Sequence, residues 1–276
     1  MKTLKSLIIY LVCGFGACGV GWAHSSSSAI AASFAASHYS HMCKYHGVCH
    51  LFCESCPDNV VRIGVGGMYG QYEGGEASGL NLAGGYINFY ARGASPKERV
   101  QIALDAHFGA NKGNMGNFPV SADRADTLGI FTEVRPMLGL NLLTQNFPLY
   151  LNIAYTFNLT NSDSGKNNTN GFVNYLHQVG VELEGIIKSS ERLRYEYSVG
   201  YDYVFSGFYR SRLDGAQTDL GGYNYGVRAS LGFAYNLSES VHYYMKLKAK
   251  YYNLTQSGIY PHTQQYIGML ELGIGF

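Results

Sequence analysis

The sequence predicts an all-β fold, a transmembrane antiparallel up-and-down β-barrel of about ten strands. Apolar and polar residues alternate with a period of two from residue 60 to the end of the chain. Charged residues avoid one of the two faces that this alternation creates, and aromatic residues stand at both ends of that face. A chain with 46% hydrophobic and 14% charged residues is neither disordered, nor collagen, nor a coiled coil.

The chain begins with features of a secretory signal peptide at residues 1–23. Lys2 and Lys5 precede an apolar run over residues 7–21, and small residues then allow cleavage before His24. The run is short for a membrane-spanning helix, which needs about 20 residues. No later segment approaches 18 uninterrupted apolar residues, so the sequence argues against a helical membrane protein.

Residues 24–59 form a predicted Ser/Ala linker, helical in part, that ends in a segment rich in cysteine and histidine. Its candidate ligands or disulfide partners are Cys43, Cys49, Cys53, Cys56, His46 and His50. In an oxidising compartment four cysteines suggest two disulfides, with three possible pairings. The same side chains suit Zn or Cu, and free thiols or intermolecular pairing are further alternatives. No other cofactor is expected.

Ten alternating segments between turn residues are the predicted strands of a barrel domain at residues 60–276. They span residues 60–72, 80–91, 100–109, 127–142, 148–159, 172–187, 193–205, 222–236, 241–253 and 263–276. Together they cover about half the chain, against the 20–25% strand of an average soluble protein. Short turns alternate with longer loops between them, as in an even-stranded membrane barrel.

One face of the strands holds all their Asp, Glu, Lys and Arg residues. These lumen-facing candidates are Arg62, Asp105, Glu133, Arg135, Glu182, Glu184, Arg194, Glu196, Asp202, Arg228, Lys246, Lys248, Lys250 and Glu271. The opposite face is apolar, which fits either a soluble barrel turned inward or a membrane barrel turned outward. Aromatic residues at both ends of the apolar face, such as Tyr223 and Tyr235, favour the membrane barrel. His177 is the misfit on the apolar face, either a neutral interface residue or a sign of a β-bulge.

The end of the chain resembles that of bacterial outer-membrane β-barrel proteins. Apolar residues occupy every second position before a terminal phenylalanine, at Tyr266, Leu270, Leu272, Ile274 and Phe276. Together with the leader and the ten strands, this resemblance covers residues 60–276. It implies a bacterial outer-membrane location, a lipid bilayer environment, and recognition of the last strand by the barrel-assembly machinery.

The function predicted from these residues is that of a surface or structural protein with a mostly closed, ionic lumen. Seven acidic and seven basic side chains inside a narrow barrel favour mutual pairing over a wide channel. The longest outer loops, one of them with Phe208, Tyr209, Arg210 and Arg212, are candidates for adhesion or for binding a host or surface ligand.

Other functions fit the sequence less well. Lys246, Lys248 and Lys250 form a one-sided cationic stripe that a narrow anion-preferring porin would use. The pair Asp105 and His107, expected on the inner face near the outer end of its strand, resembles part of an omptin protease site, and a hydrolase or lipid-modifying barrel is the enzymatic alternative. No spacing points to a serine positioned by a histidine, and we expect no enzyme. With a net charge of +1 and no basic run, no nucleic acid partner is expected.

Overall fold

The computed structural model describes the barrel region of the chain. The described residues are 60–74, 77–95, 99–115, 126–144, 147–164, 172–190, 192–211, 215–238, 241–259 and 262–276. The predicted signal peptide and the Cys/His segment with its possible disulfides or metal lie outside these residues. No helix long and apolar enough to cross a membrane occurs in the part of the chain that is described.

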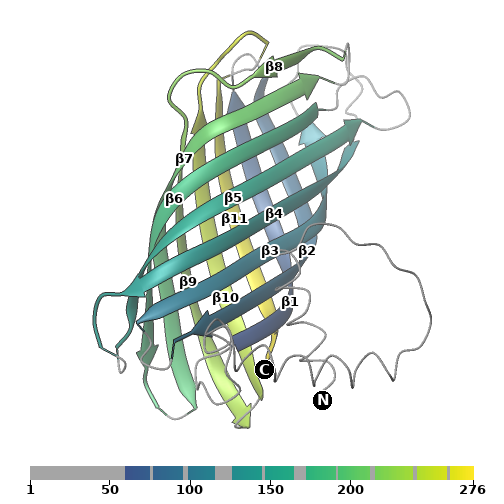
Figure 1. Cartoon of the computed structure of the whole chain (residues 1–276). Coiled ribbons are helices and arrows are strands. Elements are labelled where there is room, and N and C mark those ends of the chain that lie inside the picture. The colour runs from purple at the N-terminus through teal and green to yellow at the C-terminus, as the bar shows by residue number, and fades with distance from the viewer. Residues whose placement is uncertain are drawn as a thin grey trace, which may run out of the picture. The chain divides into compact units, whose positions relative to one another are not determined.

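The protein is a closed antiparallel barrel of ten long strands with one short additional strand (Figure 1). The strands are β1 (Val60–Gly74), β2 (Ala77–Ala94), β3 (Val100–Met115), β4 (Asp126–Asn141), β5 (Leu149–Ser164), β6 (Phe172–Lys188), β7 (Leu193–Ser211), β8 (Gln217–Asp219), β9 (Tyr225–Ser238), β10 (Val241–Leu254) and β11 (Thr263–Gly275). Each long strand pairs with its neighbours in sequence, and β1 pairs with β11 to close the sheet. The predicted fold class is confirmed.

Several strands are longer than predicted at the end that carries β8, called the upper end below as in Figure 1. β3 continues to Met115 and β7 to Ser211, and β8 lies in what the sequence presented as a loop. The long strands have 13 to 19 residues, whereas a tilted strand crosses a bilayer with about 9–11. Antiparallel pairing therefore continues beyond the apolar band. The strand ends there lack the alternation of apolar and polar residues from which the strands were predicted.

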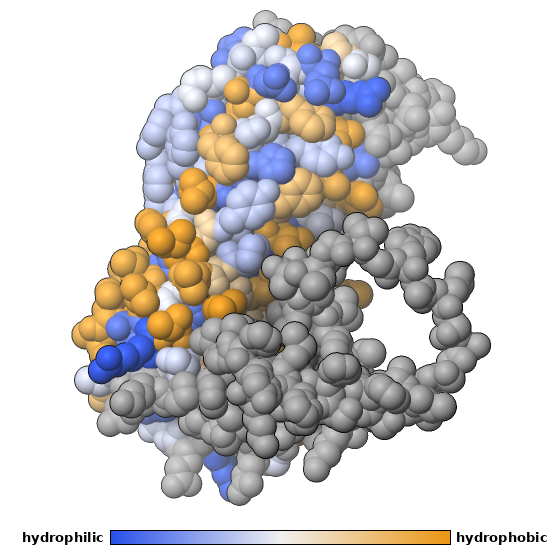
Figure 2. All heavy atoms as spheres, in the orientation of Figure 1, coloured by the Kyte–Doolittle hydropathy of each residue, from blue (hydrophilic) through white to orange (hydrophobic). Residues whose placement is uncertain are grey.

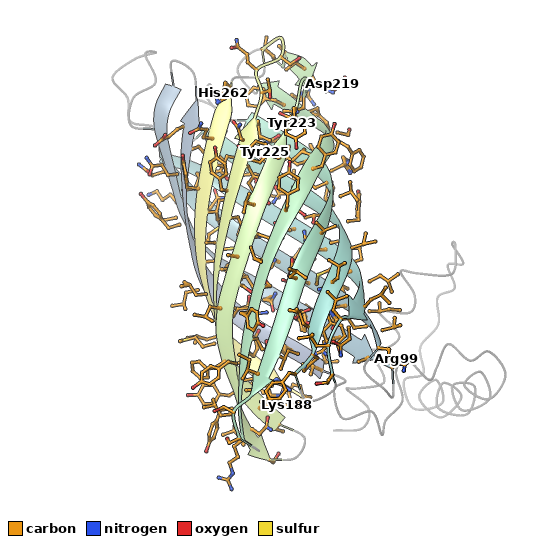
Figure 3. All side chains as sticks on the ribbon, turned by 90° about the vertical axis from the view of Figure 1, so that its left-hand side faces the viewer. Arg99, Lys188, Asp219, Tyr223, Tyr225 and His262 are labelled. Atoms are coloured by element: carbon orange, nitrogen blue, oxygen red, sulfur yellow. The ribbon has the colours of Figure 1, made fainter. Side chains whose placement is uncertain are left out.

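An apolar band surrounds the outside of the barrel. Its exposed residues include Val65, Ile87, Ile130, Leu138, Ile153, Val181, Val199, Leu231, Leu247 and Leu272. In Figure 2 strongly apolar side chains gather on the lower part of the visible wall, paler and apolar ones mix above them, and strongly hydrophilic ones lie near the upper rim. In Figure 3 Arg99 and Lys188 lie at the lower end, and Asp219 and His262 lie at the upper end. This order of charge, apolar band and charge is that of a barrel that crosses a bilayer.

Aromatic side chains occupy the wall at both edges of the apolar band. Near the upper end, Tyr251 lies 5.1 Å from Tyr266, and Tyr201 stacks on Tyr225 at 5.9 Å, measured between ring centroids. Near the lower end, Tyr243 packs edge-on against Tyr235 at 6.4 Å. Tyrosine combines an apolar ring with a polar hydroxyl, which suits the interface between hydrocarbon and water.

A β-bulge lies in β7 directly opposite His177, the misfit on the apolar face. The register between β6 and β7 shifts at this point, since His177 pairs with Ser206 and Gln178 pairs with Val204. Phe205 is therefore the extra residue, inserted in β7. His177 stays on the outer wall, among aromatic side chains.

Glycines make room for large side chains inside the narrow barrel. A Cβ atom on Gly66 would overlap the ring of Tyr86, and one on Gly64 would overlap the hydroxyl of Tyr244. Both tyrosines are buried in the lumen. The interior is thus filled by side chains from facing strands, as expected for a small barrel.

Candidate functional site: the charged interior

All fourteen charged residues expected in the lumen point inward, and most are buried. Asp105, Arg194 and Lys246 keep partial exposure, and the other eleven are 8% exposed or less. His107, which the sequence placed on the same inner face, is also buried, and the structure adds Arg92 and His242 to the buried lumen residues. Arg92 was expected in a turn, but β2 continues past it to Ala94 and turns its side chain inward.

A continuous chain of ion pairs crosses the lumen. Lys250 Nζ lies 2.6 Å from Glu133, whose carboxylate is 3.4 Å from Arg228. Arg228 in turn contacts Asp202 at 2.6 Å. Arg135 joins Asp202 at 2.8 Å to Glu182 at 2.9 Å. The charges alternate from β10 through β4, β9, β7 and β4 again to β6, so each buried charge in the chain has an opposite neighbour.

A second cluster surrounds Lys248. Its ammonium lies 3.0 Å from Asp105 and 2.9 Å from Glu271, and it donates to Nε2 of His107 at 2.8 Å. Tyr244 donates a hydrogen bond to Glu271 at 2.7 Å. Two carboxylates thus share one ammonium, and Tyr244 and His107 lie beside them as neutral partners.

Near the lower end, three cations converge on Glu196. Arg62 binds both carboxylate oxygens, with its Nη1 at 2.7 Å from Oε2. Arg194 lies 3.2 Å from the same carboxylate, and Lys246 lies 3.8 Å from it. His242 Nε2 accepts a hydrogen bond from Arg62 Nε at 3.1 Å. The bidentate Arg62–Glu196 pair is the geometry that guanidinium and carboxylate prefer.

Glu184 is held mainly by neutral groups. Gln101 donates to it at 2.8 Å, Asn152 at 3.1 Å and Tyr90 at 3.4 Å. These amides and the phenol were not predicted, because uncharged polar residues on a lumen face give no distinct signal in the sequence.

The open space inside the charged region is small. A cavity of about 40 Å³ lies among Tyr90, His107, Arg135, Ser198 and Lys246, with other lumen residues around it. Since one water needs about 10–15 Å³, this cavity has room for a few waters.

The outer-loop candidates occupy different faces. After the bulge, β7 turns Tyr209 inward, where it packs against Tyr72 and Leu82 on the facing strands β1 and β2. Tyr209 also packs against a cluster of Leu176, Val204, Tyr252 and Leu254. Phe208 instead stacks on Tyr175 on β6, with ring centroids 4.4 Å apart, and Arg210 is exposed. Arg212 lies outside the described residues.

The pair Asp105 and His107 lies in the middle of the lumen, not near the outer end of its strand. β3 continues eight residues past His107, to Met115. His107 is 1% exposed and is enclosed by Lys248 and the nearby carboxylates. The pair is therefore closed to a peptide substrate, unlike a site at a barrel mouth.

The residues of the expected assembly signal lie on the last strand. Tyr266, Leu270, Leu272 and Ile274 face outward on β11. Phe276 forms two backbone hydrogen bonds with Val61, of 2.8 and 3.1 Å, at the seam where the barrel closes. Among the described residues no group of histidine, cysteine and acidic side chains is arranged to hold a metal ion.

Comparison with known proteins agrees with this architecture. No protein-family model matches the sequence, and no curated protein matches it. Among solved structures, the outer membrane protease OmpT from Escherichia coli is similar, with a TM-score of 0.54, 10% identity, and coverage of 80% of this chain and 97% of that chain. The translocator domain of the autotransporter NalP from Neisseria meningitidis gives a TM-score of 0.46 at 11% identity, covering 88% and 97% of the two chains. The toluene transporter TodX from Pseudomonas putida gives 0.34 at 8%, covering 84% and 93%. The chain has the fold of bacterial outer-membrane β-barrel proteins.

Proposed function

We propose that this protein is an integral protein of the bacterial outer membrane that works at the cell surface and does not conduct solutes through its lumen. The observation that carries this proposal is the ion-pair chain from Lys250 to Glu182, which spans the lumen without a gap wider than 3.4 Å between partners. The apolar band and its aromatic edges support placement in a bilayer.

The cationic stripe does not form an open anion path. Lys250 and Lys248 are each held by carboxylates at 3.0 Å or less. Lys246 contacts Glu196 at 3.8 Å, and its ammonium lies 5.5 Å from the centre of the Tyr90 ring. A permeant anion would have to displace these partners in a site of low dielectric, which costs several kcal/mol for each ion.

The upper end is then the surface that meets partners. Tyr209 packs inside the barrel against Tyr72 and Leu82, which leaves Phe208, Arg210 and the neighbouring loops to contact a host or surface ligand. Loops on a rigid barrel are suitable for adhesion. The assembly machinery would act on the seam strand β11 during insertion, and the leader would be removed before it.

Conductance of the refolded protein in a planar bilayer tests the closed lumen. We expect no single-channel steps from the wild type, with insertion verified by heat-dependent migration in electrophoresis. The triple variant K246Q/K248Q/K250Q leaves Glu133 and Glu271 without lysine partners, so we expect leak currents from it and none from the exposed control K112Q. Regular steps from the wild type that lose anion preference in the triple variant would overturn the proposal in favour of a porin.

Labelling in intact cells tests the orientation. A cysteine at Asp219 should react with a membrane-impermeant maleimide in intact cells, because Asp219 is exposed at the upper end. A cysteine at Lys188, at the lower end, should react only after the outer membrane is permeabilised. The reverse pattern would contradict the proposed orientation.

A further inference from the structure

The β-bulge brings Ser206 beside His177 and Tyr155 on the outer wall, away from both the charged lumen and the loops. In a classic bulge the two residues on the bulged strand turn their side chains to the same side. Phe205 and Ser206 accordingly are both exposed on the wall, whereas Val204 and Gly207 are buried. Ser206 is also the direct cross-strand partner of His177 on β6. Cβ atoms of a regular antiparallel pair are about 4.5–5.5 Å apart, and here the bulge sets Phe205 and Ser206 together opposite His177.

His177 is held in a defined orientation. Its Nδ1 lies 2.7 Å from the hydroxyl of Tyr155 on β5. Its ring packs against Phe157 at 5.3 Å and Phe205 at 6.3 Å between centroids. Between the strand ends, His177 is the one imidazole that the described wall turns outward, since His107 and His242 are buried in the lumen.

We propose that Ser206 and His177 are the catalytic residues of an acyl-ester hydrolase site on the outer wall, with Tyr155 as the positioning residue. This constellation contains a nucleophile, a base and a third group that orients the base, which are the elements of serine hydrolase sites. With Nδ1–H donated to the oxygen of Tyr155, Nε2 of a neutral His177 is free to accept a proton.

The reaction balances with water as the second reactant. Ser206 Oγ attacks the ester carbonyl carbon while its proton passes to Nε2 of His177. The ester C–O bond then breaks, the alcohol leaves with that proton, and the acyl group remains on Ser206. Water then attacks the acyl carbon and gives a proton to His177. The bond between the acyl carbon and Ser206 Oγ breaks, Oγ takes this proton from His177, and a fatty acid is released.

The bulge also offers a group for the oxyanion. Phe205 has no partner in the β6–β7 ladder or, within the described residues, in the β7–β9 ladder. Its backbone N–H lies next to the proposed nucleophile in sequence. A backbone amide at this place is a common donor to the developing negative charge of acyl transfer.

The position of the site points to a lipid ester as the substrate. The site rests on the proposed membrane placement, because the aromatic edge of the band then lies at the level where acyl chains join their headgroups. Phe157 and the stacked pair Tyr175 and Phe208 provide an apolar surface beside it. The structure thus assigns the acyl esters of outer-leaflet lipids to this wall.

The test uses the full mature chain folded into vesicles. One set contains phosphatidylethanolamine alone, and a second also contains lipopolysaccharide, so that the two sources of acyl ester are distinguished. Released fatty acid is measured by mass spectrometry, and Ser206 is probed with a fluorophosphonate followed by peptide mapping. Heat-dependent electrophoretic migration reports insertion separately, so a failure of membrane placement is told apart from a failure of the site.

We expect fatty acid release from at least one vesicle set and fluorophosphonate on Ser206. The variants S206A and H177Q should fall to the level of protein-free vesicles, while S238A, at an exposed serine on the lower end, keeps wild-type activity. Y155F should keep the fold and shift the pH profile of kcat, which a purely structural tyrosine would not do. A folded, inserted wild type that releases no fatty acid and leaves Ser206 unlabelled would overturn the proposal, as would full activity in S206A.

Discussion

Asp202 is the residue through which the ion-pair chain is most directly tested. It is 1% exposed and accepts hydrogen bonds from Arg228 Nε at 2.7 Å and from Arg135 Nη1 at 2.8 Å, and Arg228 Nη2 lies 2.6 Å from it as an ion pair. The substitution Asp202→Asn keeps the shape and removes the charge. Breaking a buried pair costs about 3–5 kcal/mol, because an uncompensated charge remains. Arg135 still pairs with Glu182 and Arg228 still pairs with Glu133, so we expect the free energy of unfolding to fall by about 3 kcal/mol, the lower end of this range.

Lys246→Met is the matched control for this prediction. Its ammonium is 3.8 Å from Glu196, and Glu196 keeps Arg62 and Arg194 as partners when Lys246 is removed, so we expect a loss of about 1 kcal/mol or less. The free energy of unfolding would be measured by urea titration in phospholipid vesicles. Electrophoretic mobility would report the folded fraction, since the one tryptophan, Trp22, lies in the predicted signal peptide. Equal losses in the two variants, within about 1 kcal/mol, would refute the view that the chain of ion pairs is energetically coupled.

Three further variants examine other parts of the barrel. Gly180→Ala should destabilise the barrel much as D202N does, because the new Cβ would overlap the carboxylate of Asp202. A urea midpoint equal to that of the wild type would show that the ion pairs tolerate a displacement of this carboxylate. Leu247→Arg, in the middle of β10, should lower the free energy of unfolding in a bilayer by about 2–4 kcal/mol. Leu237→Arg, near the lower end, should lower it by about 0–1 kcal/mol. Similar values for the two variants would contradict the assignment of the apolar band. Tyr209→Ala should open the upper mouth, which admits a small thiol reagent to a cysteine placed at Met68; equal labelling rates with and without Tyr209 would show that it is not the seal.

Much of the barrel follows from local alternation. Each strand's apolar face follows from every second residue, so the inward direction of Arg62, Glu133 and Lys248 could be read before any partner was known. Arg92 escaped this reasoning because a glycine and a proline follow it closely, which resembles a turn. Tyr209 was expected in an outer loop because the predicted strand ended at residue 205; β7 continues to Ser211, and the inserted Phe205 reverses the faces of the residues after it.

The sequence by itself determined the fold class, the apolar exterior and the set of charges that had to be buried together. Period-two alternation is a property of each strand alone, so closure of the barrel is not needed to read it. Only the tertiary structure decided which charges pair, that Asp105 and His107 lie in mid-lumen, and that Ser206 stands beside His177. These contacts depend on the register between strands that are distant in sequence, and one bulge changes them without altering the pattern of any single strand.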